Sequence, residues 1–128
     1  MDQLSKQIYD AFDGKLVGNF KMKRQVCKAL SFMPKNIIDF VTRNCWFMSS
    51  MEDAWAFTFT GNDLKDQHLI FLSDELLLQD EQQIRYSIAH EIGHVILKHR
   101  NSVLMKQTKE EVSKQEREAD QFAKRYLG

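Results

Sequence analysis

The sequence has no long apolar run, only one proline and only two cysteines. A membrane-spanning helix needs about 20 consecutive apolar residues, so we expect no membrane partner. The first ten residues carry no apolar signal core, and Cys27 and Cys45 follow no metal-binding or redox spacing. We therefore expect a cytoplasmic protein whose two thiols are reduced and mostly packed.

The sequence also lacks an excess of charge of either sign. Lys and Arg together number 18, Asp and Glu together also number 18, and the formal net charge is zero. Nucleic-acid-binding domains normally carry a clear basic excess, so we expect no direct nucleic-acid partner. Hydrophobic residues make up 43% of the 128 residues, which is typical of one globular domain.

Helical spacing of apolar residues is present towards both ends of the chain. Near the N-terminus it predicts helices over residues 3–12 and 19–33, followed by a short proline-led helix over 34–45. Near the C-terminus it predicts an amphipathic helix over residues 80–100 and a last helix over 109–128, charged outside and apolar inside.

The middle of the chain has a different texture. Residues 45–50, 54–60 and 68–73 are short, aromatic and rich in β-forming side chains, and residues 60–67 suggest a hairpin connection. We expect a small three-stranded, mostly antiparallel sheet. The predicted fold class is therefore α+β, with N-terminal helices, a small sheet and two C-terminal helices.

The stretch "AHEIGHVILKH", residues 89–99, places His90 and His94 on one face of a helix. A catalytic zinc ion accepts three protein ligands and leaves a fourth position for water. Glu91 lies beside that face, where a carboxylate can take the proton of that water. Because Gly93 has no side chain, another backbone or a substrate can come close to the helix face that carries the two histidines. The alternative is a packed helix with two half-buried histidines and an exposed glutamate.

Two histidines need a third ligand to form such a site. Leu97 and Arg100 occupy the positions where one class of zinc proteases has a glycine and a third histidine, so that class is excluded. The segment "EREAD" in the last helix offers Glu116, with Asp120 one turn later to hold a ligand histidine in one tautomer. Glu118 is the rival ligand, but Glu116 is favoured because it shares a helix face with Asp120.

"AHEIGHVILKH" followed by "EREADQFAKRYL" resembles the ImmA/IrrE-type metallopeptidases, a branch of the gluzincin zinc peptidases. The resemblance runs from about Pro34 to the C-terminus and implies a zincin-like fold. It implies Zn²⁺ held by His90, His94 and Glu116, with Glu91 as general base. Known members of the family cleave repressor proteins, so a transcriptional repressor is one candidate substrate.

The chain departs from this family by having no room for a helix-turn-helix or sensory domain. We expect residues 1–128 to form one minimal metallopeptidase domain, with a helical part over about 1–33 and a catalytic part over about 34–128. His99 matches a histidine of the family one residue late, so we treat it as structural or substrate-side. The oligomeric state is not indicated.

The expected reaction is metal-assisted hydrolysis of a peptide bond in a protein or peptide substrate. Residues 68–74 are the candidate sheet edge for binding an extended substrate, although an interior strand is equally compatible with the pattern. The sequence leaves four candidates for an oxyanion donor, which are Tyr86, His99, Arg125 and Tyr126.

Three rival functions can be compared with this one. The main alternative is a zincin-fold binding or regulatory module that keeps the zinc site but has weak or latent catalysis. A di-iron bundle would need a second Glu-x-x-His unit, which is missing. A DNA-linked protease is disfavoured by the neutral charge and by the small number of cysteines.

Overall fold

The computed structural model describes residues 1–49, 67–97 and 109–127. Its helices are α1 (Gln3–Phe12), α2 (Phe20–Ser31), α3 (Lys35–Asn44), α5 (Asp74–Leu77), α6 (Glu81–Ile96) and α7 (Lys109–Leu127). Its strands are β1 (Leu16–Val17), β2 (Cys45–Met48) and β3 (His68–Phe71). No helix in these ranges is both long enough and apolar enough to cross a membrane.

Helices α1, α2, α5 and α6 begin where a short polar side chain caps them. Asp2, Asn19 and Asp80 each accept a hydrogen bond from the backbone N–H three residues later, at the starts of α1, α2 and α6. Such a cap contributes about 1 kcal/mol. All five predicted helices are present in the described residues, α1 with the predicted ends and the others with shifted ends. Pro34 is the N-cap of α3 rather than part of its first turn.

Helix α5 was not predicted, because four residues are too few to show a helical period. The Ser73 hydroxyl caps it by accepting a hydrogen bond from the backbone N–H of Leu76. The ammonium group of Lys21 donates to the carbonyl oxygen of Leu77 at 2.5 Å, which ties the end of α5 to α2.

The sheet is parallel, so the predicted antiparallel arrangement is wrong. Its order is β1-β2-β3, with Leu16 paired to Phe47 and Phe47 to Ile70 in the same strand direction. The chain between β1 and β2 passes through α2 and α3, and such a crossover returns the second strand parallel to the first. The two-residue strand β1 had no sequence signal of its own.

Part of that prediction lies outside the described residues. The proposed strand over residues 54–60 and the hairpin connection over 60–67 fall there almost entirely. The β3 prediction, residues 68–73, is confirmed with its end two residues earlier.

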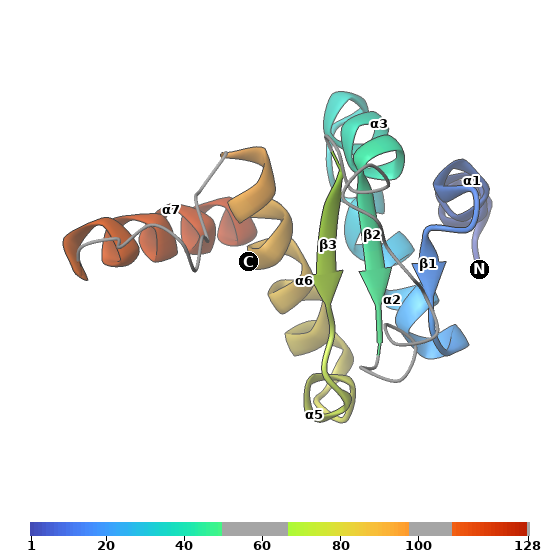
Figure 1. Cartoon of the computed structure of the whole chain (residues 1–128). Coiled ribbons are helices and arrows are strands. Elements are labelled where there is room, and N and C mark those ends of the chain that lie inside the picture. Colours follow the sequence, from blue (N-terminus) through green and yellow to red (C-terminus); the bar gives the residue numbers. More distant parts are fainter. Residues whose placement is uncertain (50–66, 98–108, 128) are drawn as a thin grey trace.

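Helices α2 and α6 lie on the same face of the sheet, and the strands pass in front of both in Figure 1. A single core cluster joins the N-terminal residues to the rest, and Phe12 on α1 meets Phe47 on β2 edge to face at 5.8 Å. Cys27 and Cys45 are free and buried as expected, and burial raises the pKa of both thiols to about 12. They are therefore packing residues rather than nucleophiles.

Candidate metal centre

Helix α6 presents an apolar side to the core and a polar side to α7. Ile84, Ile88 and Ile92 recur every four residues and are buried completely. The side chains of His90 and His94 keep 17% and 21% of their surface exposed. The same helical spacing that buries the isoleucines therefore leaves both imidazoles at the boundary between the core and solvent.

Helix α7 packs on α6 through small residues. Its buried residues are Ala119 and Ala123. On the α6 side, a Cβ added to Gly93 would lie 3.1 Å from Cβ of Phe122, closer than side chains normally pack. The glycine therefore admits Phe122 of α7, whereas the sequence suggested another backbone or a substrate. This close approach brings α7 within reach of the histidines.

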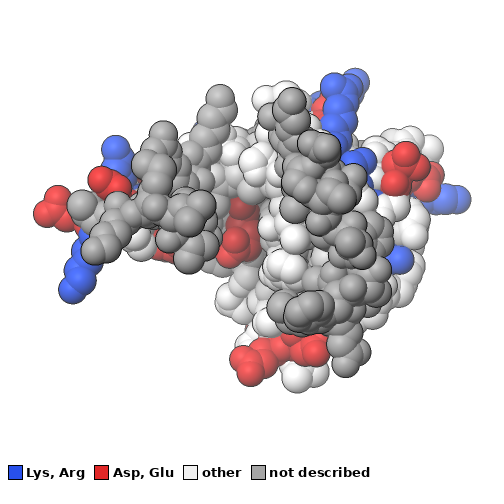
Figure 2. All heavy atoms as spheres, in the orientation of Figure 1, with Lys and Arg blue, Asp and Glu red and all other residues white. Residues whose placement is uncertain are grey.

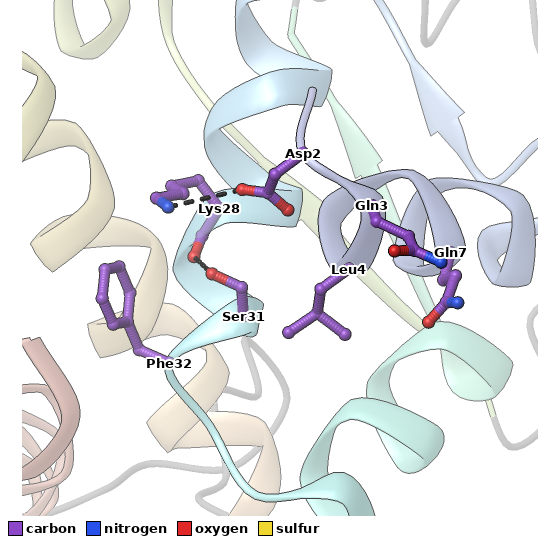
Figure 3. Close-up of a pocket in the computed structure, with 7 residues that line it drawn as sticks. All are labelled: Asp2, Gln3, Leu4, Gln7, Lys28, Ser31 and Phe32. Atoms are coloured by element: carbon purple, nitrogen blue, oxygen red, sulfur yellow. Dashed lines mark hydrogen bonds and ion pairs between the residues drawn. The ribbon is translucent and has the colours of Figure 1, made fainter.

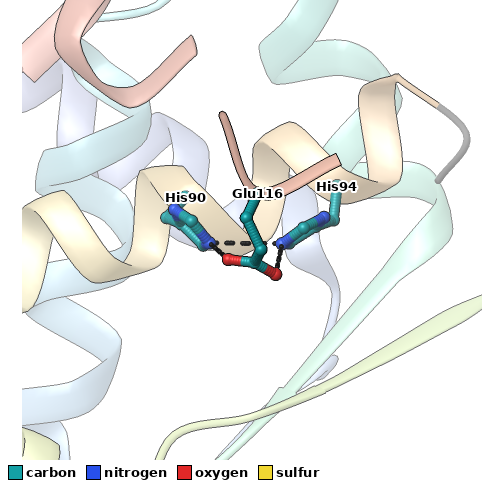
Figure 4. A group of neighbouring side chains, drawn as sticks. All are labelled: His90, His94 and Glu116. Carbon is teal, nitrogen blue, oxygen red and sulfur yellow. Dashed lines mark hydrogen bonds and ion pairs between the residues drawn. The ribbon is translucent and has the colours of Figure 1, made fainter. Parts of the chain in front are cut away.

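The two helices bring His90, His94 and Glu116 together, as Figure 4 shows. Nε2 of His90 lies 2.9 Å from Oε2 of Glu116, and Nε2 of His94 lies 3.1 Å from Oε1. The two Nε2 atoms are 3.2 Å apart. One carboxylate from α7 thus faces both imidazoles of α6, and the three predicted ligands converge at one place.

The hydrogen-bond partners of His90 make this group suitable for a cation. Nδ1 of His90 lies 2.9 Å from Oδ1 of Asp120, where it can donate a hydrogen bond to the carboxylate. In that tautomer Nε2 faces Glu116 with its lone pair, and a cation between these two acceptors would satisfy both. His90, His94 and Glu116 each offer one ligand atom within 4.8 Å of the others, and two imidazoles with one carboxylate are a donor set that zinc accepts.

Asp120 lies where the sequence suggested a residue that orients a ligand histidine. Its carboxylate also lies 3.5 Å from the hydroxyl of Tyr86, one turn before His90 on α6. Burial first, and then the Asp120 carboxylate, raises the pKa of Tyr86. The contact between Tyr86 and Asp120 was not predicted from the sequence, although the spacing of Tyr86, His90 and His94 by four residues places them on one helix face.

Glu118, the rival third ligand, lies on a different face of α7 from Glu116. Its carboxylate lies 4.0 Å from the ammonium group of Lys114, one turn earlier on the same helix. Glu118 is not a member of the group that could hold a metal ion. The helix geometry therefore favours Glu116, as the shared face with Asp120 predicted.

The remaining predicted site residues lie outside the group of His90, His94 and Glu116. Glu91 is exposed on α6, directly after His90, so its carboxylate is open to solvent. Among the oxyanion candidates, Tyr126 packs its ring edge to face against Phe122 at 5.1 Å, and the Arg125 guanidinium lies over the Tyr126 ring at 5.6 Å. His99 lies outside the described residues.

Other surface features lie away from this group. On the face in Figure 2, basic and acidic side chains of the described residues are interspersed rather than separated by sign. A groove of about 600 Å³ lies between α1 and α2 (Figure 3). It is lined by Asp2, Gln3, Leu4, Gln7, Lys28, Ser31 and Phe32, and none of these belongs to the metal-ligand group.

Residues 82–127 match a sequence model of the family described as Peptidase U49. This stretch covers nearly all of α6 and the whole of α7, the two helices that carry the histidines and the glutamate. No curated protein and no solved structure matches the chain. The family match supports a peptidase, and hence a hydrolase. The finer resemblance to ImmA/IrrE-type metallopeptidases and the zincin-like fold stay predictions.

Proposed function

We propose that the protein is a zinc-dependent metallopeptidase that hydrolyses peptide bonds of a protein substrate. The observation that carries the proposal is the convergence of His90, His94 and Glu116 from α6 and α7. The match of the same two helices to a peptidase family supports the reaction class independently of the geometry. A cytoplasmic setting remains part of the proposal.

In this proposal His90, His94 and Glu116 hold the ion. When bound, zinc supplies Lewis-acid activation of a carbonyl group and of a water molecule. Asp120 accepts the Nδ1 proton of His90, which keeps Nε2 of that ring as the free electron-pair donor. Nε2 of His94 faces the other oxygen of Glu116, so both rings present Nε2 to the same carboxylate.

Glu91 is the proposed general base. It follows His90 directly and its side chain is exposed, and in this proposal it takes up a water molecule at the site. Its carboxylate would accept the proton of that water as the water attacks the carbonyl carbon. The same carboxyl group would then return the proton to the leaving amine, which completes hydrolysis of the C–N bond.

Strand β3 is the proposed edge for an extended substrate. Within the described residues it pairs with β2 on one side only, and Phe71 near its end is exposed. The backbone of an unpaired strand edge can bind a peptide by adding one more strand. A transcriptional repressor is a candidate substrate from the family resemblance alone.

Glu91→Gln is the variant that tests the proposal. We expect about one zinc ion per chain by mass spectrometry in both wild type and variant, because Glu91 is not a ligand. Hydrolysis of a quenched fluorescent protein substrate should fall about 10²- to 10⁴-fold in the variant, since the base is gone. Glu110→Gln, an exposed glutamate in the first turn of α7, is the matched control and should change neither value.

The outcomes separate the proposal from the alternative. Zinc binding with activity that survives Glu91→Gln would favour a binding or regulatory module with a retained metal site. Absence of zinc from the wild type, even after the metal is added back, would contradict the metallopeptidase hypothesis. Zinc retained in Glu116→Ala would show that Glu116 is not the third ligand.

A further inference from the structure

Tyr86 lies on the same face of α6 as the two histidines, one turn before His90. Its ring packs against the hydrophobic core, so the phenol has little freedom to rotate away. A tyrosine held in this way carries its hydroxyl group at a fixed place beside α7. The question is what that hydroxyl does there.

The hydroxyl of Tyr86 meets Asp120 at two atoms. It lies 3.5 Å from the carboxylate oxygen Oδ1 and 3.5 Å from the backbone carbonyl oxygen of the same residue. Both atoms are acceptors, so the phenol is the donor. Oδ1 is also the oxygen that accepts the proton of Nδ1 of His90 at 2.9 Å. The Tyr86 hydroxyl and the His90 ring therefore hold one carboxylate oxygen from two sides.

This arrangement leaves the Tyr86 hydroxyl with a structural partner rather than with the substrate. A phenol has one proton to donate, and both acceptors near it here belong to Asp120. Tyr86 is therefore a poor choice among the oxyanion candidates. The raised pKa of Tyr86 keeps the phenol protonated at neutral pH, as a donor must be.

We propose that Tyr86 is a positioning residue for the metal centre. Its hydroxyl holds the Asp120 carboxylate against Nδ1 of His90, and it thereby keeps Nε2 of His90 as the ring atom available to the cation. The inference rests on the proposed function for its metal, but the tautomer of His90 can be measured without any metal. The contact of 3.5 Å is longer than a strong O–H···O bond, so its effect is expected to be modest.

The test is zinc affinity measured by competition with a chelating dye for Tyr86→Phe, Asp120→Ala and the double variant. Loss of one weak hydrogen bond corresponds to about a threefold to tenfold weaker affinity for Tyr86→Phe. Loss of the carboxylate corresponds to about a tenfold to 100-fold weaker affinity for Asp120→Ala. The double variant should bind as weakly as Asp120→Ala, because the hydroxyl acts through that carboxylate.

Tyr9→Phe is the matched control, since it removes the same hydroxyl from an exposed tyrosine on α1. It should bind zinc as the wild type does. The inference is overturned if Tyr86→Phe also binds as the wild type does. It is equally overturned if Tyr86→Phe weakens affinity by the same factor in the Asp120→Ala background, because the ring would then act by packing alone.

A second measurement uses the metal-free chain. Nitrogen NMR shifts of the histidine rings, recorded at a pH where imidazole is neutral, report which nitrogen carries the proton. We expect His90 to carry it on Nδ1 in the wild type and to move towards the Nε2 form in Tyr86→Phe. An unchanged tautomer would contradict the inference. If the wild type binds no zinc, the proposed function fails, and this measurement still decides the role of Tyr86.

Discussion

Helices α2 and α7 both pack on α6, but they are held by different means. Among the 12 residues of α2, Met22, Gln25, Val26, Cys27, Ala29 and Leu30 are buried. Among the 19 residues of α7, Ala119 and Ala123 are buried. Helix α2 is therefore attached through large apolar side chains. Helix α7 buries only two alanines, its larger residues Phe122, Tyr126 and Leu127 are only partly buried against the core, and it carries the polar group around Glu116, so a bound ion should matter more to α7.

Leu30→Ala on α2 should have the largest effect on stability. Leu30 is buried completely, and deleting a buried leucine side chain to alanine costs about 2–5 kcal/mol. Urea unfolding of the metal-free chain measures the loss. Phe32→Ala is the control, because that large apolar residue at the end of α2 is 49% exposed. A loss below about 1 kcal/mol for Leu30→Ala would contradict the contrast between the helices.

Removal of zinc should lower hydrogen-exchange protection more in α7 than in α2. Zinc at about 100 times its dissociation constant adds about 2.7 kcal/mol to the free energy of unfolding. Hydrogen exchange should show that chelation lowers protection in α7, because Glu116 no longer links it to both histidines of α6. Glu116→Ala should abolish this zinc dependence, and Glu110→Ala should retain it. Equal changes in α2 and α7 would show that the ion does not act locally.

Gly93→Ala should have the smallest effect of the three on the free energy of unfolding. Whether it stabilises or destabilises shows how tightly α6 and α7 pack. Alanine favours a helix by about 1 kcal/mol over glycine, but overpacking costs about 1–3 kcal/mol. Because the new Cβ would lie 3.1 Å from Cβ of Phe122, which cannot rotate away, we expect a net loss of about 1 kcal/mol.

A double-mutant cycle in urea unfolding locates the cause of that loss. Phe122→Ala removes Cγ and Cδ1, which would lie 3.2 and 3.1 Å from the new Cβ, so the two changes should be coupled. Zinc affinity should also fall in Gly93→Ala, since a shift of α7 moves Glu116. Stabilisation by Gly93→Ala with unchanged zinc affinity would mean that the helices do not depend on this close approach.

The convergence of His90, His94 and Glu116 could be expected from the sequence because local helical geometry fixes which residues share a face. A spacing of four places His90 and His94 on one face whatever the rest of the fold does. The same spacing groups Glu116 with Asp120 and leaves Glu118 on another face, beside Lys114. The pairing of two separate helices could be inferred only from the combination of both motifs.

The direction of the sheet could not be predicted in the same way. Strand pairing depends on how the chain returns from one strand to the next, and β1 offers only Leu16 and Val17 as a signal. The aromatic residues after residue 45 suggested antiparallel strands, whereas β1, β2 and β3 pair in parallel. The contact between Tyr86 and Asp120 was not predicted because it depends on how closely α6 and α7 pack and on their relative shift along the helix axes.

The double use of α6 limits how its sequence can vary. Its buried isoleucines fill the core, Gly93 admits Phe122, and the histidines and Tyr86 contact polar groups of α7. Intolerance to substitution should therefore extend around most of the circumference of this helix. On α7 it should be restricted to one narrow stripe, so natural variants of this protein should diverge first on the outer surface of α7.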